Sequence, residues 1–112
     1  MGFKVEEHQG VIVVKVDLLR ATLTEAEEFK AMLTKNILPG KHNIIVDLLD
    51  CEFIDSTFLG TLVVALKKAT GLGGDLRLVG FHHSVQSMFE LTRMHRVFET
   101  YETLDKALES FE

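Results

Sequence analysis

The sequence predicts a single α/β domain in which a mixed β-sheet of four to five strands packs against about four helices. Short β-branched runs alternate with segments of helical period in the order β-α-β-α-β. The chain has 112 residues, 46% of them hydrophobic, which is enough for one core but too short for two ordinary domains. No linker, repeat or low-complexity segment interrupts it, so we expect residues 1–112 to form one domain.

The amino end has the pattern of a β-hairpin. Two strand-like runs, one around Val5 and one over residues 11–15, flank His8-Gln9-Gly10, which has the composition of a tight turn. A helix is expected next, because Thr24 to Glu27 has capping-box spacing. Its apolar positions with helical period are Ala26, Phe29, Leu33 and Ile37. Pro39-Gly40 is expected to end the helix.

The middle of the chain predicts a strand, a helix and a second strand. Ile44-Ile45-Val46, closed by Asp47, has the composition of a buried strand. A helix stripe follows at i, i+3, i+4 and i+7, formed by Leu59, Leu62, Val63 and Leu66. The glycines between residues 71 and 74 follow this helix and precede the strand 76–79. They are therefore predicted to be a helix C-cap and turn, since phosphate-binding glycine loops precede a helix.

The last third predicts two more helices around a short edge strand. A helix is expected from Ser84 to about Thr92, with inward positions Val85, Met88 and Phe89. Residues 97–101 have the composition of an edge strand. The final helix is expected to start at Thr103, and its apolar stripe is Leu104, Ala107, Leu108 and Phe111.

A hydroxyl pair, Ser56 and Thr57, stands where the apolar run Phe53-Ile54 meets the second helix. Ser56 is expected at or next to the N-cap. Asp, Ser and Thr are preferred there because their oxygens accept hydrogen bonds from the free N–H groups of the first turn. The same N–H groups and the helix dipole accommodate a phosphate on Ser56 without breaking the fold. Local chemistry does not separate capping from phosphate acceptance.

Charge and composition exclude several classes of partner. The formal net charge is -5 and no Lys or Arg run interleaves with aromatic residues, so nucleic-acid binding is not expected. The amino end lacks the apolar core of a signal peptide, and no apolar run approaches the length of a membrane span. We therefore expect a cytoplasmic protein without membrane partners. The single cysteine, Cys51, is expected to fill space in the core or at a loop edge.

The sequence predicts no enzyme, metal site or cofactor. Ser56 does not stand in the Gly-x-Ser-x-Gly elbow of a serine hydrolase. Three carboxylates could in principle hold magnesium: Asp47, Asp50 and Asp55. Their favoured roles, however, are to end a strand and to cap a helix. Three histidines, His82, His83 and His95, could be imagined as metal ligands. We expect them to be scattered surface residues instead.

Over nearly its whole length the chain resembles the STAS domain, and within that family the small bacterial anti-sigma factor antagonists. The resemblance rests on residues 43–47, on Phe53-Ile54-Asp55-Ser56-Thr57 followed by Leu59-Gly60, and on residues 74–79. The carboxy half, from Val85 to Leu108, is also similar. The Asp-Ser-Thr after an apolar pair at the end of this strand is a fairly specific mark of the family.

The resemblance implies a phosphorylation switch. Antagonists of this family bind an anti-sigma factor that is also a serine kinase, and phosphorylation of the serine after the aspartate ends the binding. Carried over to this chain, Ser56 is the phosphate acceptor, Asp55 its acidic neighbour and Thr57 the second hydroxyl position. The predicted contact surface is the helix from Phe58 to Thr70, and the partner-binding residues are predicted to be Asp55, Ser56, Thr57, Phe58 and Thr61.

Phe58 departs from the family pattern, because glycine usually follows the two hydroxyl residues. We expect its ring to stand exposed next to Ser56, where it either anchors a partner or blocks a kinase. The alternative function is therefore an interaction or scaffold module that is never phosphorylated and that uses Phe58 as an apolar anchor. The partner, the oligomeric state and the strand order stay open.

Overall fold

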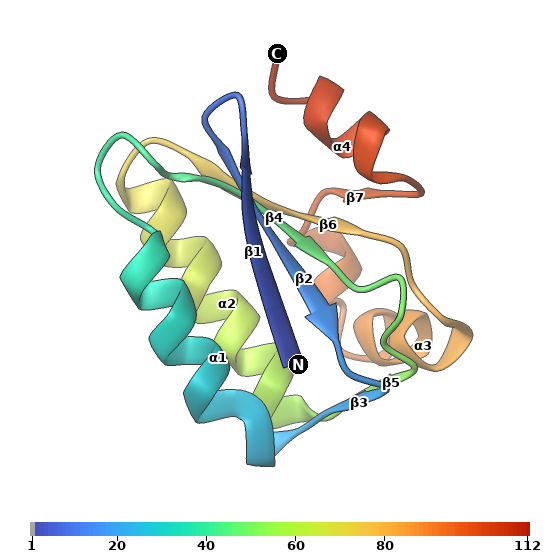
Figure 1. The fold of residues 1–112 in the computed structure, drawn as a ribbon. Coiled ribbons are helices and arrows are strands. Elements are labelled where there is room, and N and C mark those ends of the chain that lie inside the picture. The colour runs from blue at the N-terminus through green and yellow to red at the C-terminus, as the bar shows by residue number, and fades with distance from the viewer. Residues whose placement is uncertain (1) are drawn as a thin grey trace.

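The computed structural model describes residues 2–112 as a twisted sheet covered by helices, with a smaller sheet at one end (Figure 1). The main sheet has five strands in the order β1-β2-β4-β6-β7, which are β1 (Gly2–His8), β2 (Val11–Asp17), β4 (Asn43–Asp47), β6 (Asp75–Val79) and β7 (Thr100–Tyr101). β1 pairs antiparallel with β2, and the other neighbours are parallel. The prediction of a mixed sheet is confirmed.

The predicted hairpin is present, with a two-residue turn. Gln9 and Gly10 both have positive φ, 54° and 87°. Two successive residues in this region give the turn whose twist matches the flanking strands. The pairing of His8 with Val11 closes the hairpin and sets the register of β1 on β2.

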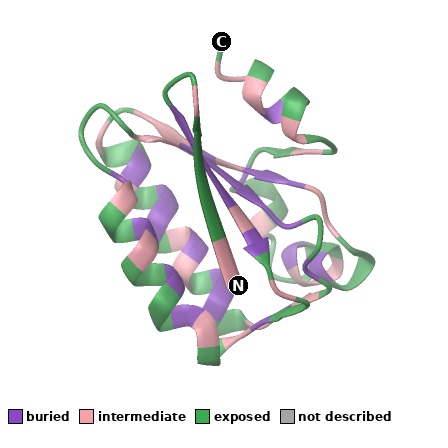
Figure 2. Cartoon of the chain, in the orientation of Figure 1, coloured by how far each residue is buried: buried purple, intermediate pink, exposed green. Residues whose placement is uncertain are grey.

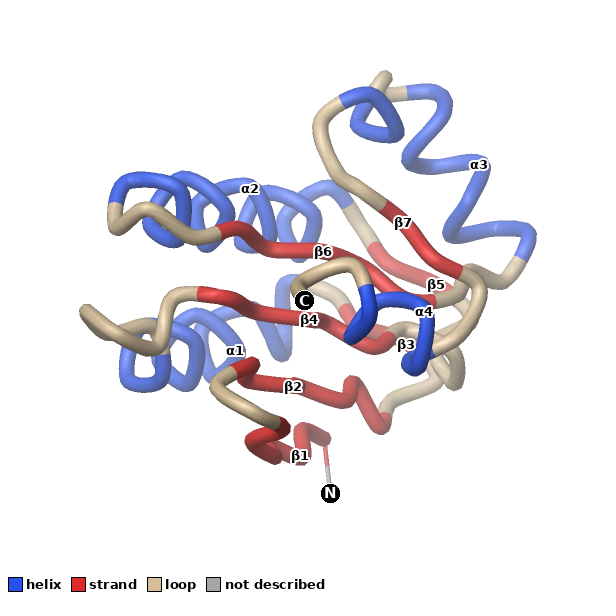
Figure 3. The backbone as a smooth tube through the Cα atoms, turned by 90° about the horizontal axis from the view of Figure 1, so that it is seen from above, coloured by secondary structure: helices blue, strands red, loops and turns tan. Residues whose placement is uncertain are grey.

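Three helices lie on one face of the main sheet and one lies on the other (Figure 3). They are α1 (Leu23–Asn36), α2 (Ser56–Gly71) and α3 (His83–Leu91) on the first face, and α4 (Leu104–Glu109) on the second. Each of the first three connects parallel strands while the chain moves in one direction across the sheet. Because such crossovers are right-handed, they place their helices on the same face.

Burial follows from this layering (Figure 2). Alternate residues of β2, β4 and β6, such as Val14, Val46 and Leu78, pack with α1, α2 and α3 into the larger core. The intervening residues, such as Val13, Ile45 and Val79, form a second cluster under Ala107 of α4. The central strands are therefore apolar on both faces, as expected for parallel strands covered on two sides.

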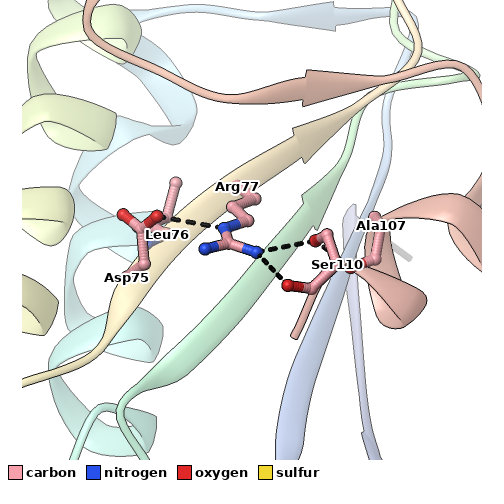
Figure 4. A network of polar contacts seen from close by, with 5 residues as sticks. All are labelled: Asp75, Leu76, Arg77, Ala107 and Ser110. Carbon is pink, nitrogen blue, oxygen red and sulfur yellow. Dashed lines mark hydrogen bonds and ion pairs between the residues drawn. The ribbon is translucent and has the colours of Figure 1, made fainter. Parts of the chain in front are cut away.

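A polar network holds α4 against the sheet (Figure 4). Arg77 of β6 donates from Nη1 to the carbonyl oxygen and the hydroxyl of Ser110, at 2.7 Å in each case. Its Nε donates to Asp75 at 3.0 Å, and the guanidinium lies over the ring of Phe111 at 4.1 Å from the centroid. One arginine thus joins a strand to the carboxy-terminal segment by hydrogen bonds and by stacking.

Two predicted boundaries are wrong. The helix expected to start at Thr24 begins at Leu23, because the capping box is formed by Thr22 and Glu25 two residues earlier. The strand expected over residues 97–101 is limited to β7, and Met94–Arg96 before it form a 3-10 helix. Phe98 is buried and packs edge-on against Phe89, so tertiary packing draws this residue into the core instead of into a strand.

A second, two-stranded sheet was not predicted from the sequence. It pairs β3 (Arg20–Ala21) in parallel with β5 (Phe53–Ile54), through Arg20 with Phe53 and Ala21 with Ile54. Two-residue strands carry too little periodicity to be recognised in a sequence. This small sheet nevertheless sets the position of the candidate functional site, because each of its strands leads directly into a helix.

Candidate functional site

The small sheet brings two helix starts together. One residue after β3 the chain enters α1, and one residue after β5 it enters α2. Thr22 and Asp55 are the two N-cap residues, and the Asp55 N–H donates to the carbonyl of Ala21 at 3.3 Å. Since β3 and β5 are parallel and in register, α1 and α2 begin side by side at one edge of the molecule (Figure 1).

The carboxylate of Asp55 binds both helix starts. Its Oδ1 accepts from the N–H of Phe58 in the first turn of α2 at 2.9 Å, which is an ordinary N-cap bond. Its Oδ2 accepts from the N–H of Leu23, the first residue of α1, also at 2.9 Å. Both helices present the positive ends of their dipoles here, so a carboxylate is favoured between them.

Ser56 is the first residue of α2 and is exposed. The open question of whether Ser56 is the cap is answered, since Asp55 is the N-cap and its side chain makes the capping bond. Thr57 follows on the same exposed turn, and its carbonyl accepts from the hydroxyl of Thr61 at 3.2 Å. The Ser56 hydroxyl therefore lies at the surface beside the free N–H groups of a helix start.

The expectation that Phe58 is exposed is wrong. Its side chain is 0% exposed, and its ring stacks on Phe29 of α1 with the centroids 4.4 Å apart. Phe3 of β1 completes the stack at 6.4 Å. Phe58 is a core residue, because the third position of α2 faces α1, and it cannot contact a partner in this structure.

The two helices that start here carry exposed apolar side chains, Val64 and Leu23, at positions that the sequence reasoning missed. Val64 is 56% exposed and continues the α2 surface of Thr57 and Thr61 at i+7. That spacing was a signal which could have identified it. Leu23 is 66% exposed at the start of α1. No sequence pattern places Leu23 next to Ser56, because this proximity depends on the small sheet.

The three carboxylates considered for a metal have separate partners. Asp47 accepts from the N–H of Leu49 at 2.9 Å, and Asp50 pairs with Lys15 at 3.0 Å. Asp55 caps the two helices. Within residues 2–112 no group of three His, Cys, Asp or Glu side chains is arranged to hold a metal ion.

Cys51 is buried close to the site, as expected of a core or loop-edge residue. Its thiol donates to the carbonyl of Phe53 at 3.3 Å. Burial raises the pKa of the Cys51 thiol above its usual value, because the thiolate would lose its hydration. The thiol therefore acts as a small apolar group that supports β5.

This chain is similar over most of its length to proteins that are named as anti-sigma factor antagonists. A protein of Thermotoga neapolitana named "putative anti-sigma factor antagonist" is 30% identical over 108 residues, which cover 96% of this chain and 93% of that protein. The crystal structure of an anti-sigma factor antagonist from Mycobacterium paratuberculosis is 26% identical, with a TM-score of 0.86, 96% of this chain covered and 91% of that chain.

The anti-sigma factor antagonist SpoIIAA in its unphosphorylated form shares the fold, with a TM-score of 0.83 at 16% identity, covering 97% of this chain and 95% of that chain. In residues 2–112 none of the helices has the length and apolar character required to cross a membrane. The family model of the STAS domain matches residues 3–107. The chain thus belongs to the STAS domain family, and its relative in Thermotoga neapolitana carries the name of an anti-sigma factor antagonist.

Proposed function

We propose that the protein is a phosphorylation-controlled anti-sigma factor antagonist. In its unmodified form it binds an anti-sigma factor that is also a serine kinase, and phosphorylation of Ser56 releases that partner. One observation carries the proposal: the exposed Ser56 is the first residue of α2, while Asp55 makes the capping bond. A kinase can therefore reach the hydroxyl without removing a bond on which α2 depends. The proposed place of action is the cytoplasm, where sigma factors work.

The expected effect of the phosphate on folding is small. A phosphate adds about -1.5 to -2 charges, and at a helix N-terminus its effect is favourable by about 0.3 to 1 kcal/mol. The fold is compatible with this modification, since SpoIIAA, which shares it, is known in a phosphorylated form. The proposed switch therefore acts at the partner interface and leaves the domain folded.

The expected effect on binding is large. A charge buried against a partner without a matching cation costs about 2 to 5 kcal/mol, which corresponds to roughly thirty-fold to several-thousand-fold in affinity. We place the contact surface along the exposed side of α2, from Ser56 and Thr57 through Thr61 to Val64. Val64 takes the place of Phe58 as the apolar contact, because it is exposed and Phe58 is not.

The first experiment is mass spectrometry of the protein isolated from its own host, beside Ser56→Ala and Thr57→Ala variants. We expect one phosphate, mapped to Ser56, present in Thr57→Ala and absent from Ser56→Ala. A protein that stays unmodified across growth and stress conditions would contradict the proposal and favour a constitutive interaction module. A phosphate on Thr57 alone would also contradict it.

The second experiment measures the partner. Immobilised wild-type protein should retain an anti-sigma factor with kinase activity from the host extract, and Ser56→Asp should retain at least thirty-fold less. Melting curves should show that Ser56→Asp remains folded with nearly the same melting temperature. Equal retention by the two proteins would contradict the proposed switch.

A further inference from the structure

The start of α1 carries an exposed leucine that the fold does not require. Leu23 is 66% exposed and does not belong to the core clusters. Its N–H, which in most helices lacks an intrahelical partner, donates to the carboxylate of Asp55 from a segment 32 residues away. The position of Leu23 thus depends on a residue that directly precedes the proposed phosphate acceptor.

Leu23 and Ser56 occupy equivalent places. Ala21 pairs with Ile54, the next residues, Thr22 and Asp55, are the two N-caps, and the residues after those are Leu23 and Ser56. The two are therefore the first residues of helices that begin side by side, as Figure 1 shows for α1 and α2. A partner that covers the Ser56 hydroxyl is therefore placed next to the start of α1, where Leu23 stands.

We propose that Leu23 is a second contact residue for that partner, and that the carboxylate of Asp55 couples its position to the modification state of Ser56. The inference rests on the proposed function, because it requires a partner and a phosphate at this site. The partner is then expected to present an apolar pocket for Leu23 beside the group that reaches Ser56.

The coupling follows from competition at the helix starts. A phosphate on Ser56 brings up to two negative charges one residue from the Asp55 carboxylate, and its oxygens accept from the same first-turn N–H groups of α2. Like charges at this distance disfavour the present position of the carboxylate. The bond from the Leu23 N–H to Oδ2 of Asp55 is the one that can be lost while α2 keeps its cap, because phosphate oxygens attached to α2 can replace Oδ1 as acceptors for the first turn of that helix.

The coupling adds one effect to charge repulsion. The phosphate places charge in the interface, and it also loosens the first turn of α1 that presents Leu23. The capping box of Thr22 and Glu25 remains in place, so the rest of α1 stays helical. The change is therefore expected to be confined to the amides around Leu23.

The coupling is tested on the isolated protein, without a partner. Full-length protein with phosphoserine incorporated at position 56 is compared with unmodified protein by nitrogen-15 NMR and amide hydrogen exchange. We expect the Leu23 amide to shift and to exchange at least five-fold faster, while amides in the second half of α1 do not change. Asp55→Asn, which keeps the shape of the side chain, should weaken the same amide bond without a phosphate. Phosphoserine placed at position 57 is the matched control, with a smaller effect on Leu23.

An unchanged Leu23 amide in the phosphorylated protein would overturn the coupling, even if Ser56 is phosphorylated in the host and the proposed function holds. The contact role is tested separately with the partner retained by wild-type protein. Leu23→Ala should bind at least ten-fold more weakly, whereas Leu91→Ala, which removes an even more exposed leucine on α3, should bind like wild type. Equal affinity of Leu23→Ala and wild type would overturn the contact role.

Discussion

The rings of Phe29 and Phe58 stack with centroids 4.4 Å apart and planes 22° from parallel. Both side chains are 0% exposed, so the contact joins the first turn of α2 to α1 inside the core. Aromatic pairs of this geometry contribute beyond their buried area. Because Phe58 is held inward, the two residues before it, Ser56 and Thr57, are held at the surface.

Replacement of Phe58 by alanine should destabilise the domain by about 3 to 5 kcal/mol, because it removes a buried ring and leaves a cavity beside Phe29. Urea unfolding of the variant and the wild type measures this difference. Val64→Ala on the same helix is the control and should change the free energy of unfolding by less than about 0.5 kcal/mol, since Val64 is exposed. A loss below about 1 kcal/mol in Phe58→Ala would contradict the buried position.

Gly74→Ala should destabilise the protein by about 1 to 3 kcal/mol. A Cβ at residue 74 would overlap the backbone carbonyl of His42, which itself accepts from the N–H of Asp75. Gly71→Ala is the matched control, because a Cβ there meets nothing within 4 Å and the residue is helical. That variant should be neutral or more stable by up to about 1 kcal/mol. Thermal melts of both variants test the pair, and equal stability of the two would refute the close approach.

Arg77→Ala should release α4 from the sheet. The substitution removes two hydrogen bonds to Ser110 and the stacking on Phe111, at a cost of about 1 to 3 kcal/mol. Hydrogen exchange should become faster in residues 104–109 and stay unchanged in α1. Arg77→Lys keeps the charge but lacks the planar fork, so it should restore only part of the protection. Arg96→Ala removes an exposed arginine and should behave like wild type.

The free energy of unfolding should fall at alkaline pH because the buried thiol of Cys51 resists losing its proton. Burial raises the pKa of this thiol in the folded protein, so the folded state holds the proton after the unfolded chain has lost it. The contribution is complete below the pKa of an unfolded cysteine, about 8.5, and is lost as pH rises toward the folded value. Urea unfolding between about pH 7 and pH 10 should show a decline that is shallower in Cys51→Ala. Identical slopes in the two proteins would exclude this contribution.

Much of the secondary structure could be predicted from local pattern. The hairpin around Gln9 and Gly10, the buried strand at residues 43–47 and the apolar stripes of α2 and α4 have clear periodicity, and the structure contains each of them. Short elements held by tertiary contacts were missed. β3 and β5 have two residues each, and Phe98 is buried in the core instead of pairing in the sheet.

The family, the layered α/β architecture and the hydroxyl pair at the start of a helix follow from the sequence alone, because these depend on residue type and spacing along the chain. Which side chains around Ser56 face outward depends instead on the packing of the folded chain. Phe58 turns inward because α1 offers Phe29 on that side, and Leu23 lies beside Ser56 because a two-residue sheet aligns the two helix starts. The carboxylate of Asp55 bridges segments 32 residues apart. Such contacts depend on how distant segments pack, which local periodicity does not encode.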